Sequence, residues 1–191
     1  MKTSISKITS AILLFVAFSF STINAQKKEI NTDKSTVQWK GYKVTGSHEG
    51  FVAIKSGTLN FESDKLTGGE FIIDMTSISC TDLSGGIADK FVGHLNSDDF
   101  FGVANYPTAT LVFTEVVPGT NNNYKVTGDI TIKGKTEKIT FDLLIEDNKA
   151  STSFKVDRTK FDIKYGSASF FDGLKNKAIY NEFDLVVSLA F

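Results

Sequence analysis

The chain has 191 residues, with 21 basic and 22 acidic side chains and a net charge of −1 at neutral pH. This balance gives no electrostatic reason to bind nucleic acid or anionic lipid headgroups, so we expect neither as a partner. The length fits one domain, and the single cysteine, Cys80, excludes an internal disulfide, so the core must hold the fold together.

Residues 1–25 have the order of a secretory signal peptide. Lys2 and Lys7 precede an apolar run over 11–20, and Ile23-Asn24-Ala25 follows it. The run of about ten apolar residues is too short to span a bilayer, which needs roughly 20. We therefore expect cleavage after Ala25, a mature domain over 26–191 with a net charge of −3, and no integral membrane anchor. The expected location is the periplasm, with release from the cell as the alternative.

Alternation with a period of two residues dominates the mature chain. In the final segment, for example, Phe183, Leu185, Val187, Leu189 and Phe191 share one face. Short connections rich in Asn, Asp and Gly separate the segments, which favours antiparallel neighbours. The alternation predicts eight strands, near 35–44, 51–61, 69–79, 108–117, 123–133, 138–146, 151–164 and 178–190.

The segment 126–145 contains two runs in which apolar residues alternate with polar ones, separated by a charged turn. A loop of two residues (Gly134-Lys135) or four (134–137) places even-numbered apolar residues opposite odd-numbered ones. Ile130 then faces Ile139 or Phe141, and one side of the hairpin stays apolar.

Alternation is lost between 79 and 107. Ile87, Phe91 and Leu95 are spaced by four residues, as on a helix with one apolar stripe. Ser97, followed by two aspartates, resembles the N-cap of a second helical turn. We predict a helical insertion over 84–104 that caps one end of a sheet structure. Cys80, just before it, is interpreted as a small buried hydrophobe at the end of a strand.

Eight antiparallel strands with one apolar face each form either a two-sheet sandwich or a closed barrel. Composition alone does not choose between them. The interior of an eight-stranded barrel is either filled by side chains or has room for one small ligand. Both alternatives remain open at this point.

Three stretches resemble the YceI-like polyisoprenoid-binding proteins of bacteria. They are 94–101 (HLNSDDFF) with 106–110 (YPTAT), 128–136 (GDITIKGKT) and 157–163 (DRTKFDI), in the family's order. The resemblance runs from about Asp33 to the C-terminus. It implies an all-β fold: an eight-stranded antiparallel lipocalin-like barrel with a short helical insertion capping one end. It also implies an apolar channel for an isoprenoid, such as a quinone tail, or for a fatty-acid-like amphiphile, and a homodimer.

The chain also departs from the family's pattern. Lys34, Lys43 and Lys133 stand where many members carry histidine. Head-group contacts made by those histidines therefore do not carry over to this chain.

The apolar positions of the alternating segments, together with the insertion, supply the candidate residues for lipid binding. They are Trp39, Phe51, Leu59, Phe61, Phe71, Ile73, Leu95, Phe100, Phe101, Leu111, Phe113, Ile130, Ile132, Phe141, Leu143, Phe154 and Phe161. Three further residues are candidates for head-group contact: Arg158, His48 and His94. Arg158 is the only arginine, and its alternative role is a structural ion pair or carbonyl clamp. The alternative for His48 is a solvated turn residue.

No catalytic or cofactor motif is present. The chain lacks a Gly-x-Ser-x-Gly elbow, a phosphate loop and a paired His-Glu motif, and no base can be assigned to the serines of 166–171. His94 with Asp98 and Asp99 lacks the spacing of a zinc site, so we expect no metal and no cofactor. The expected function is extracytoplasmic lipid binding for carriage or storage. The alternative is a ligand-free structural or interaction domain with a fully packed barrel.

Overall fold

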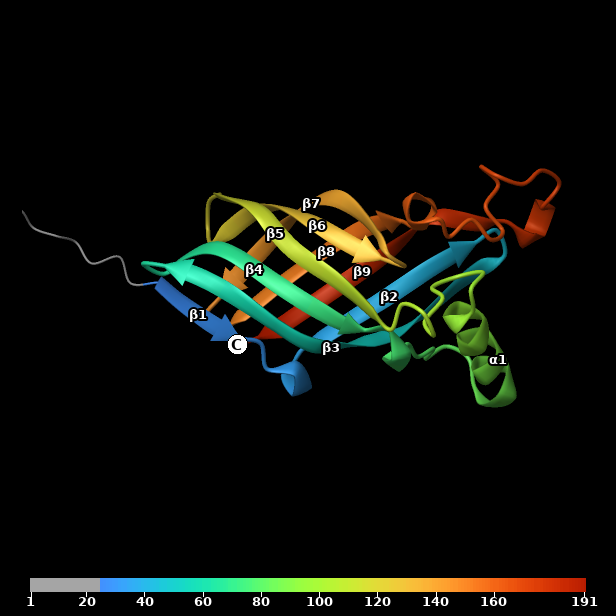
Figure 1. Ribbon diagram of the computed structural model, residues 1–191, viewed down its shortest axis with the longest axis horizontal. Coiled ribbons are helices and arrows are strands. Elements are labelled where there is room, and N and C mark those ends of the chain that lie inside the picture. Colours follow the sequence, from blue (N-terminus) through green and yellow to red (C-terminus); the bar gives the residue numbers. More distant parts are fainter. Residues whose placement is uncertain (1–24) are drawn as a thin grey trace, which may run out of the picture.

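The computed structural model describes residues 25–191, which form nine strands and one α-helix (Figure 1). All but the last residue of the expected signal peptide lies outside this range. The strands are β1 (Ala25–Glu29), β2 (Thr36–Lys43), β3 (Gly46–Glu62), β4 (Lys65–Asp74), β5 (Thr108–Pro118), β6 (Asn123–Ile132), β7 (Lys135–Glu146), β8 (Lys149–Asp157) and β9 (Ile179–Ala190). The helix is α1 (Gly85–Asn96), and four 3-10 turns are η1 (Thr32–Lys34), η2 (Met75–Ser77), η3 (Arg158–Phe161) and η4 (Lys175–Lys177).

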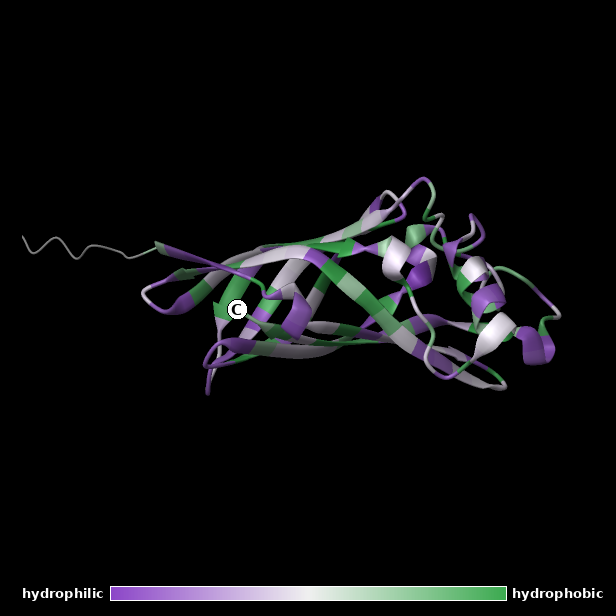
Figure 2. Cartoon of the chain, turned by 90° about the horizontal axis from the view of Figure 1, so that it is seen from below, coloured by the Kyte–Doolittle hydropathy of each residue, from purple (hydrophilic) through white to green (hydrophobic). Residues whose placement is uncertain are grey.

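The sheet closes on itself. Its strand order is β3-β2-β9-β8-β7-β6-β5-β4, and β4 pairs back with β3, so eight antiparallel strands form a barrel. This confirms the eight-stranded barrel and rules out the sandwich. Closure means that the inward side chains of all eight strands share one interior, whereas the outward ones face solvent. Hydrophobic and hydrophilic residues alternate along the strands (Figure 2).

The ninth strand, β1, was not predicted. It pairs with the C-terminal part of β3, from Ala25 opposite Glu62 to Glu29 opposite Thr58. β2 occupies the same edge of β3 earlier along that strand, from Lys43 opposite Gly46 to Val37 opposite Val52. Main-chain hydrogen bonds to this edge hold β1, whose residues 25–29 carry no apolar alternation to reveal a strand.

The hairpin at 126–145 has the predicted parity but a different register. The loop consists of Lys133 and Gly134, with φ of 49° and 71°, as in the two-residue turns whose twist matches a hairpin. Val126 therefore lies opposite Phe141, and Ile130 opposite Glu137 rather than Ile139 or Phe141. The loop was placed one residue too late because lysine seldom adopts a positive φ.

The insertion contains one helix where two helical segments were expected. Ser97 is the C-cap of α1, and its hydroxyl donates to the carbonyl of His94 at 2.7 Å. The chain then turns back, because the amide of Gly102, at φ 56°, donates to the carbonyl of Ser97 at 2.8 Å. The reading of Ser97 as an N-cap was therefore wrong. No helix within residues 25–191 is long and apolar enough to cross a membrane.

The apolar stripe of α1 is buried only in part. Leu95 is 6% exposed, whereas Ile87 is 69% exposed. Phe91 is partly buried and contacts the core cluster at this end of the barrel. The helix therefore covers one end of the barrel with its C-terminal half (Figure 1).

Gly134 offers a direct test of the hairpin turn. A Cβ at this position would lie 2.7 Å from Cε1 of Tyr106, and φ is already positive. We expect Gly134→Ala to lower the free energy of unfolding by about 1–2 kcal/mol, since it adds both strain and a clash. Gly93→Ala is the matched control: it lies within α1 with nothing within 4 Å of the added carbon. It should stabilise by about 0.5–1 kcal/mol. Urea denaturation measures both, and equal effects would contradict the assigned turn.

Candidate functional site

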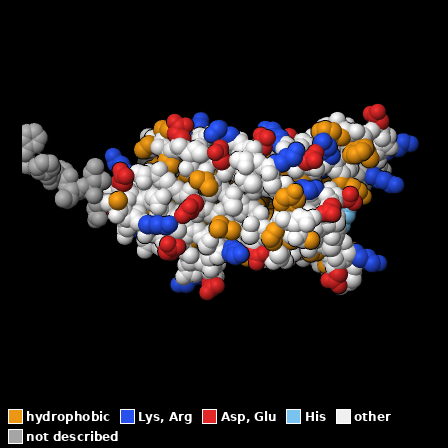
Figure 3. Space-filling view, viewed as in Figure 1, with side chains coloured by type: hydrophobic (Ala, Val, Ile, Leu, Met, Phe, Trp, Pro, Cys, Tyr) orange, Lys and Arg blue, Asp and Glu red, His pale blue; other side chains and the backbone are white. Residues whose placement is uncertain are grey.

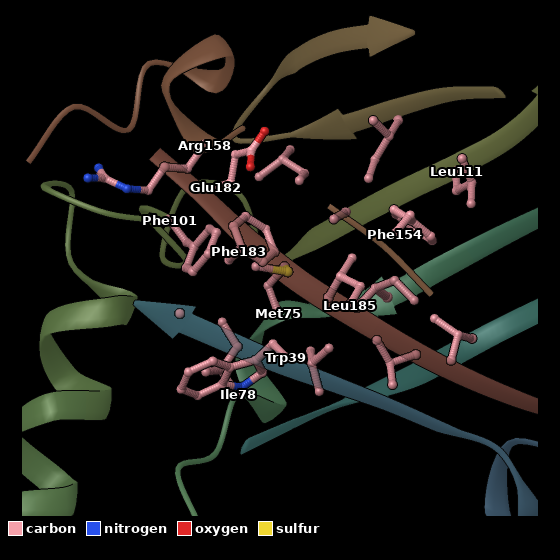
Figure 4. Close-up of a pocket in the computed structure, with 18 of the residues that line it drawn as sticks. Trp39, Met75, Ile78, Phe101, Leu111, Phe154, Arg158, Glu182, Phe183 and Leu185 are labelled. Atoms are coloured by element: carbon pink, nitrogen blue, oxygen red, sulfur yellow. The ribbon is translucent and has the colours of Figure 1, made fainter. Parts of the chain in front are cut away.

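The barrel encloses an apolar cavity at the α1 end. Its volume is about 340 Å³, within the usual range of ligand pockets. Strands all round the barrel, the insertion and the C-terminal half of α1 contribute to its wall. Figure 4 shows Trp39, Phe101 and Arg158 toward the α1 end, with Leu111 and Phe154 deeper in the barrel.

The cavity has a floor of aromatic rings. Phe71 and Phe113 have ring centroids 5.6 Å apart, and Phe113 and Phe141 have centroids 5.9 Å apart. Phe141 also stacks on Phe154 at 4.8 Å. Two inward glycines make room for these rings, because a Cβ on Gly57 would lie 2.6 Å from Phe71 and one on Gly69 would lie 2.9 Å from Phe113.

Beyond the floor, the barrel is packed. Leu59 and Val126 are fully buried there, and the rings of Phe61 and Phe191 lie 5.8 Å apart. None of these residues lines the cavity. The expectation of a long channel is therefore met by a cavity that extends past the ring of Phe154 as far as Leu189 but does not reach the packed far end of the barrel.

Most of the predicted lining residues do line the cavity. They are Trp39, Phe71, Ile73, Leu95, Phe100, Phe101, Leu111, Phe113, Ile130, Ile132, Phe141, Leu143 and Phe154. Alternation identified the inward face of their strands correctly, because successive side chains of a strand point to opposite faces.

Four predicted lining residues lie elsewhere. Phe51 is on the outer face of β3 and 42% exposed, whereas its neighbours Val52 and Ile54 point inward. Leu59 and Phe61 belong to the packed half of the barrel. Phe161 lies in η3 and is 1% exposed, buried among core residues outside the cavity wall. The parity of β3 was misread because the β3–β4 register shifts between Ile54 and Ser56.

Several lining residues were missed. The largest group comes from β9, whose alternation was recognised but not assigned to the site. The missed apolar residues are Val37, Val52, Ile54, Met75, Ile78, Phe91, Ala109, Ile179, Phe183, Leu185, Val187 and Leu189. Tyr42, Lys43, Tyr180 and Glu182 also line the cavity, whose surface is nevertheless almost entirely apolar.

Arg158 lines the cavity, yet its guanidinium is engaged with the backbone. It donates to the carbonyls of Ile163 at 2.6 Å, Tyr180 at 3.0 Å and Ile179 at 3.1 Å. The residue is 4% exposed, and this burial lowers the pKa of Arg158. The geometry is that of a carbonyl clamp that joins η3 to the start of β9.

The two histidines occupy different environments. His48 lies in β3 and not in a turn, and its side chain lines the cavity wall. Its Nδ1 lies 2.8 Å from Oδ2 of Asp82. His94 does not line the cavity; it packs edge-on against Phe100 at 5.1 Å and Tyr165 at 4.5 Å. His94 therefore lies among aromatic rings outside the cavity wall and not at a head-group position.

A network of polar and charged side chains from β2, β8 and β9 lies beside the cavity. The hydroxyl of Tyr42 donates to Oδ2 of Asp184 at 2.5 Å, and Lys155 pairs with Oδ1 at 3.0 Å. The hydrogen bond from Tyr42, aided by Lys155, lowers the pKa of Asp184. This carboxylate is therefore ionised at neutral pH and holds the end of β2 against β9.

The fold and the cavity together define a small antiparallel barrel protein with an internal apolar cavity. The sequence matches the family model of the YceI-like domain over residues 28–191, so the chain belongs to the YceI-like family. UPF0312 proteins of Shewanella denitrificans and Vibrio parahaemolyticus are 32% identical over 84 residues and 33% identical over 104 residues. These matches cover 44% and 50% of this chain, which spans 42% and 52% of the length of those relatives.

Solved structures show the same barrel. BcnA of Burkholderia cenocepacia superposes with a TM-score of 0.69 at 24% identity, covering 85% of this chain and 99% of that one. A polyisoprenoid binding domain from Saccharophagus degradans superposes with a TM-score of 0.56 at 13% identity, covering 85% of this chain and 97% of that one. At these identities the likeness concerns the fold.

Substitution of Arg158 distinguishes a clamp from a head-group ligand. We expect Arg158→Met to lower the free energy of unfolding by about 2–4 kcal/mol, because buried carbonyls lose their donors. Arg158→Lys should lose about half as much, because a lysine cannot reproduce the fork of donors. Denaturation measures the stability, and lipid titration of the folded variants measures the affinity. Unchanged stability combined with much weaker lipid binding would instead favour head-group contact.

Proposed function

We propose that this protein binds the hydrocarbon chain of an isoprenoid, or of a related amphiphile, inside its barrel. The observation that carries the proposal is the apolar cavity of about 340 Å³ within a closed wall. The YceI-like family membership and the fold shared with a polyisoprenoid binding domain support it. A fully packed, ligand-free barrel is the alternative. Only the far end of the barrel, around Leu59 and Val126, is packed in this way.

The tail should dominate the affinity. Each buried methylene contributes about 0.8 kcal/mol, so one isoprene unit of five carbons contributes roughly 3–4 kcal/mol before the costs of association. One hydrogen bond to a head group contributes about 1 kcal/mol. Because aromatic rings close the cavity below, affinity should rise with tail length and then level off once the tail reaches Phe113 and Phe141.

A binding role without catalysis fits the polar groups of the loop 166–171. The hydroxyl of Ser167 donates to Oδ1 of Asn181 at 2.7 Å, and Ser169 accepts from the amide of Asn181 at 2.8 Å. An amide cannot act as the base that a nucleophilic serine requires. We therefore propose that these serines fix the loop to β9.

Organic extraction followed by mass spectrometry tests the proposed ligand. Freshly purified protein should release a long-chain lipid in near-stoichiometric amount, and lipid-free protein should bind tails of graded length with rising affinity. Ala109→Phe should lower affinity at least about tenfold, since the added ring fills part of the cavity that Ala109 lines. Ala53→Phe, on the exposed outer face of β3, is the matched control and should bind as the parent does. Protein without lipid, and with no dependence on tail length, would favour the packed alternative.

We further propose export and carriage. The signal peptide expected over residues 1–25 would bring the domain to the periplasm. Exposed apolar side chains gather at the end where the segment 162–178 lies (Figure 3), with Phe170 at 49% and Phe171 at 50% exposure. Lys175 and Lys177 follow in the same segment. Such a surface suits contact with a membrane from which a lipid is taken. The homodimer stays a prediction from family resemblance.

Transfer kinetics separate carriage from storage. The double substitution Phe170→Ser and Phe171→Ser should slow lipid uptake from phosphatidylglycerol-containing vesicles by about tenfold, because these rings would no longer enter the interface. Lipid affinity at equilibrium should not change, because neither residue lines the cavity. Val112→Ser with Val117→Ser, on the exposed face of β5, is the control. Equal uptake rates for the two double variants would argue against this docking surface.

A further inference from the structure

His48, Cys80 and Asp82 meet at the rim of the cavity. His48 lies in β3, and the other two lie in the segment 78–84 that leads from η2 to α1. Nδ1 of His48 is 2.8 Å from Oδ2 of Asp82, and Sγ of Cys80 is 3.2 Å from Oδ1 of Asp82. All three potential ligand atoms lie within 4.8 Å of one another. No local spacing predicts this cluster, since 32 positions separate His48 from Cys80.

Several contacts fix the segment 78–84 against the barrel. The amide of Ser79 donates to the carbonyl of Phe51 at 2.9 Å, and the amide of Thr81 donates to that of Glu49 at 2.9 Å. Trp39 Nε1 donates to the carbonyl of Ser79 at 3.1 Å. Cys80 is thus half-buried in a loop bonded to β3, rather than fully buried at a strand end as predicted from sequence.

The carboxylate of Asp82 and the imidazole of His48 are also held in place. The amide of Glu49 donates to Oδ1 of Asp82 at 3.0 Å. The imidazole of His48 packs on the ring of Phe91, with centroids 4.6 Å apart. Partial burial acts to raise the pKa of Asp82, but hydrogen bonds from Glu49, His48 and Cys80 outweigh it and lower this pKa to about 2. A fixed carboxylate therefore lies between an imidazole and a thiol.

The arrangement does not suit a nucleophilic cysteine. Burial raises the pKa of the Cys80 thiol, and the hydrogen bond to Asp82 raises it further. An activated thiolate needs a cation or a base beside it, and here its hydrogen-bond partner is an anion. A divalent cation would reverse this effect, because it neutralises the carboxylate and displaces the proton of the thiol.

We propose that His48, Cys80 and Asp82 bind a single Zn²⁺ ion. Imidazole nitrogen, thiolate and carboxylate are the donors that zinc uses, whereas Mg²⁺ and Ca²⁺ prefer oxygen alone. Tetrahedral zinc bonds of about 2.0–2.3 Å place neighbouring ligand atoms roughly 3.3–3.6 Å apart. Nδ1 of His48 and Oδ2 of Asp82, 2.8 Å apart, need to separate by about half an ångström, and the widest pair of ligand atoms, within 4.8 Å, needs to approach. The side chains of His48 and Asp82 are 20% and 32% exposed, which leaves them room to adjust.

The ion would join the segment 78–84, and with it α1, to β3. Three protein ligands leave a fourth position for water or for a polar group. Since His48 also lines the cavity, that position lies at the rim, close to where the head group of a bound amphiphile would emerge. The zinc site does not depend on the proposed lipid binding, and either can fail without the other.

Cobalt titration tests the site, because Cys80 is the only cysteine in the chain. Chelator-treated protein titrated with Co²⁺ should develop a thiolate-to-metal charge-transfer band that can arise only from Cys80. Zn²⁺ should abolish the band, raise the thermal midpoint and protect Cys80 from alkylation. The last readout uses the unmodified chain and therefore does not depend on a variant folding.

Variants then assign the ligands. Cys80→Ser, His48→Gln and Asp82→Asn should each weaken Zn²⁺ binding by more than about 100-fold, beyond the cost of disturbing an outer-shell partner. Asp99→Asn, an exposed acid of the insertion, is the control and should bind as the parent does. The absence of a charge-transfer band, or unchanged zinc affinity in Cys80→Ser, would overturn the proposal.

Discussion

The pairing of β4 with β3 closes the sheet into a barrel. Once this edge closes, each inward side chain of the eight strands must fit within a single interior. An open sheet of the same strands could bury its apolar face against another layer, and no enclosed space would result. The cavity, the packed far end and the position of the helix all follow from closure.

Within the closed barrel, the distribution of large and small residues decides where space remains. Gly57 and Gly69 allow the rings of Phe71 and Phe113 to lie across the interior, where they form the floor. Below this floor aromatic and branched side chains meet in a solid core. Above it the inward side chains reach toward one another without filling the centre. The packed far end stabilises the fold, so the cavity can remain open to a ligand.

The rim is where polar chemistry is concentrated. Arg158 fastens η3 to β9 through backbone carbonyls, and Tyr42 fastens β2 to β9 through Asp184. His48 and Asp82 join β3 to the segment before α1. These contacts hold the elements around the opening in place, which a hydrophobic wall alone does not do because apolar contacts have little directionality. A metal ion at His48, Cys80 and Asp82 would strengthen one of them.

Alternation along the chain was enough to predict eight of the nine strands, their antiparallel pairing and most of the cavity wall, because side-chain alternation is a local property of the backbone. Its resemblance to the YceI-like family chose the barrel over the sandwich. Three features were decided only in three dimensions. β1 is held by main-chain bonds that leave no side-chain pattern, and the bulge in β3 moved Phe51 outward. The meeting of His48 with Cys80 and Asp82 depends on a loop lying along β3, and no spacing along the chain encodes such a contact.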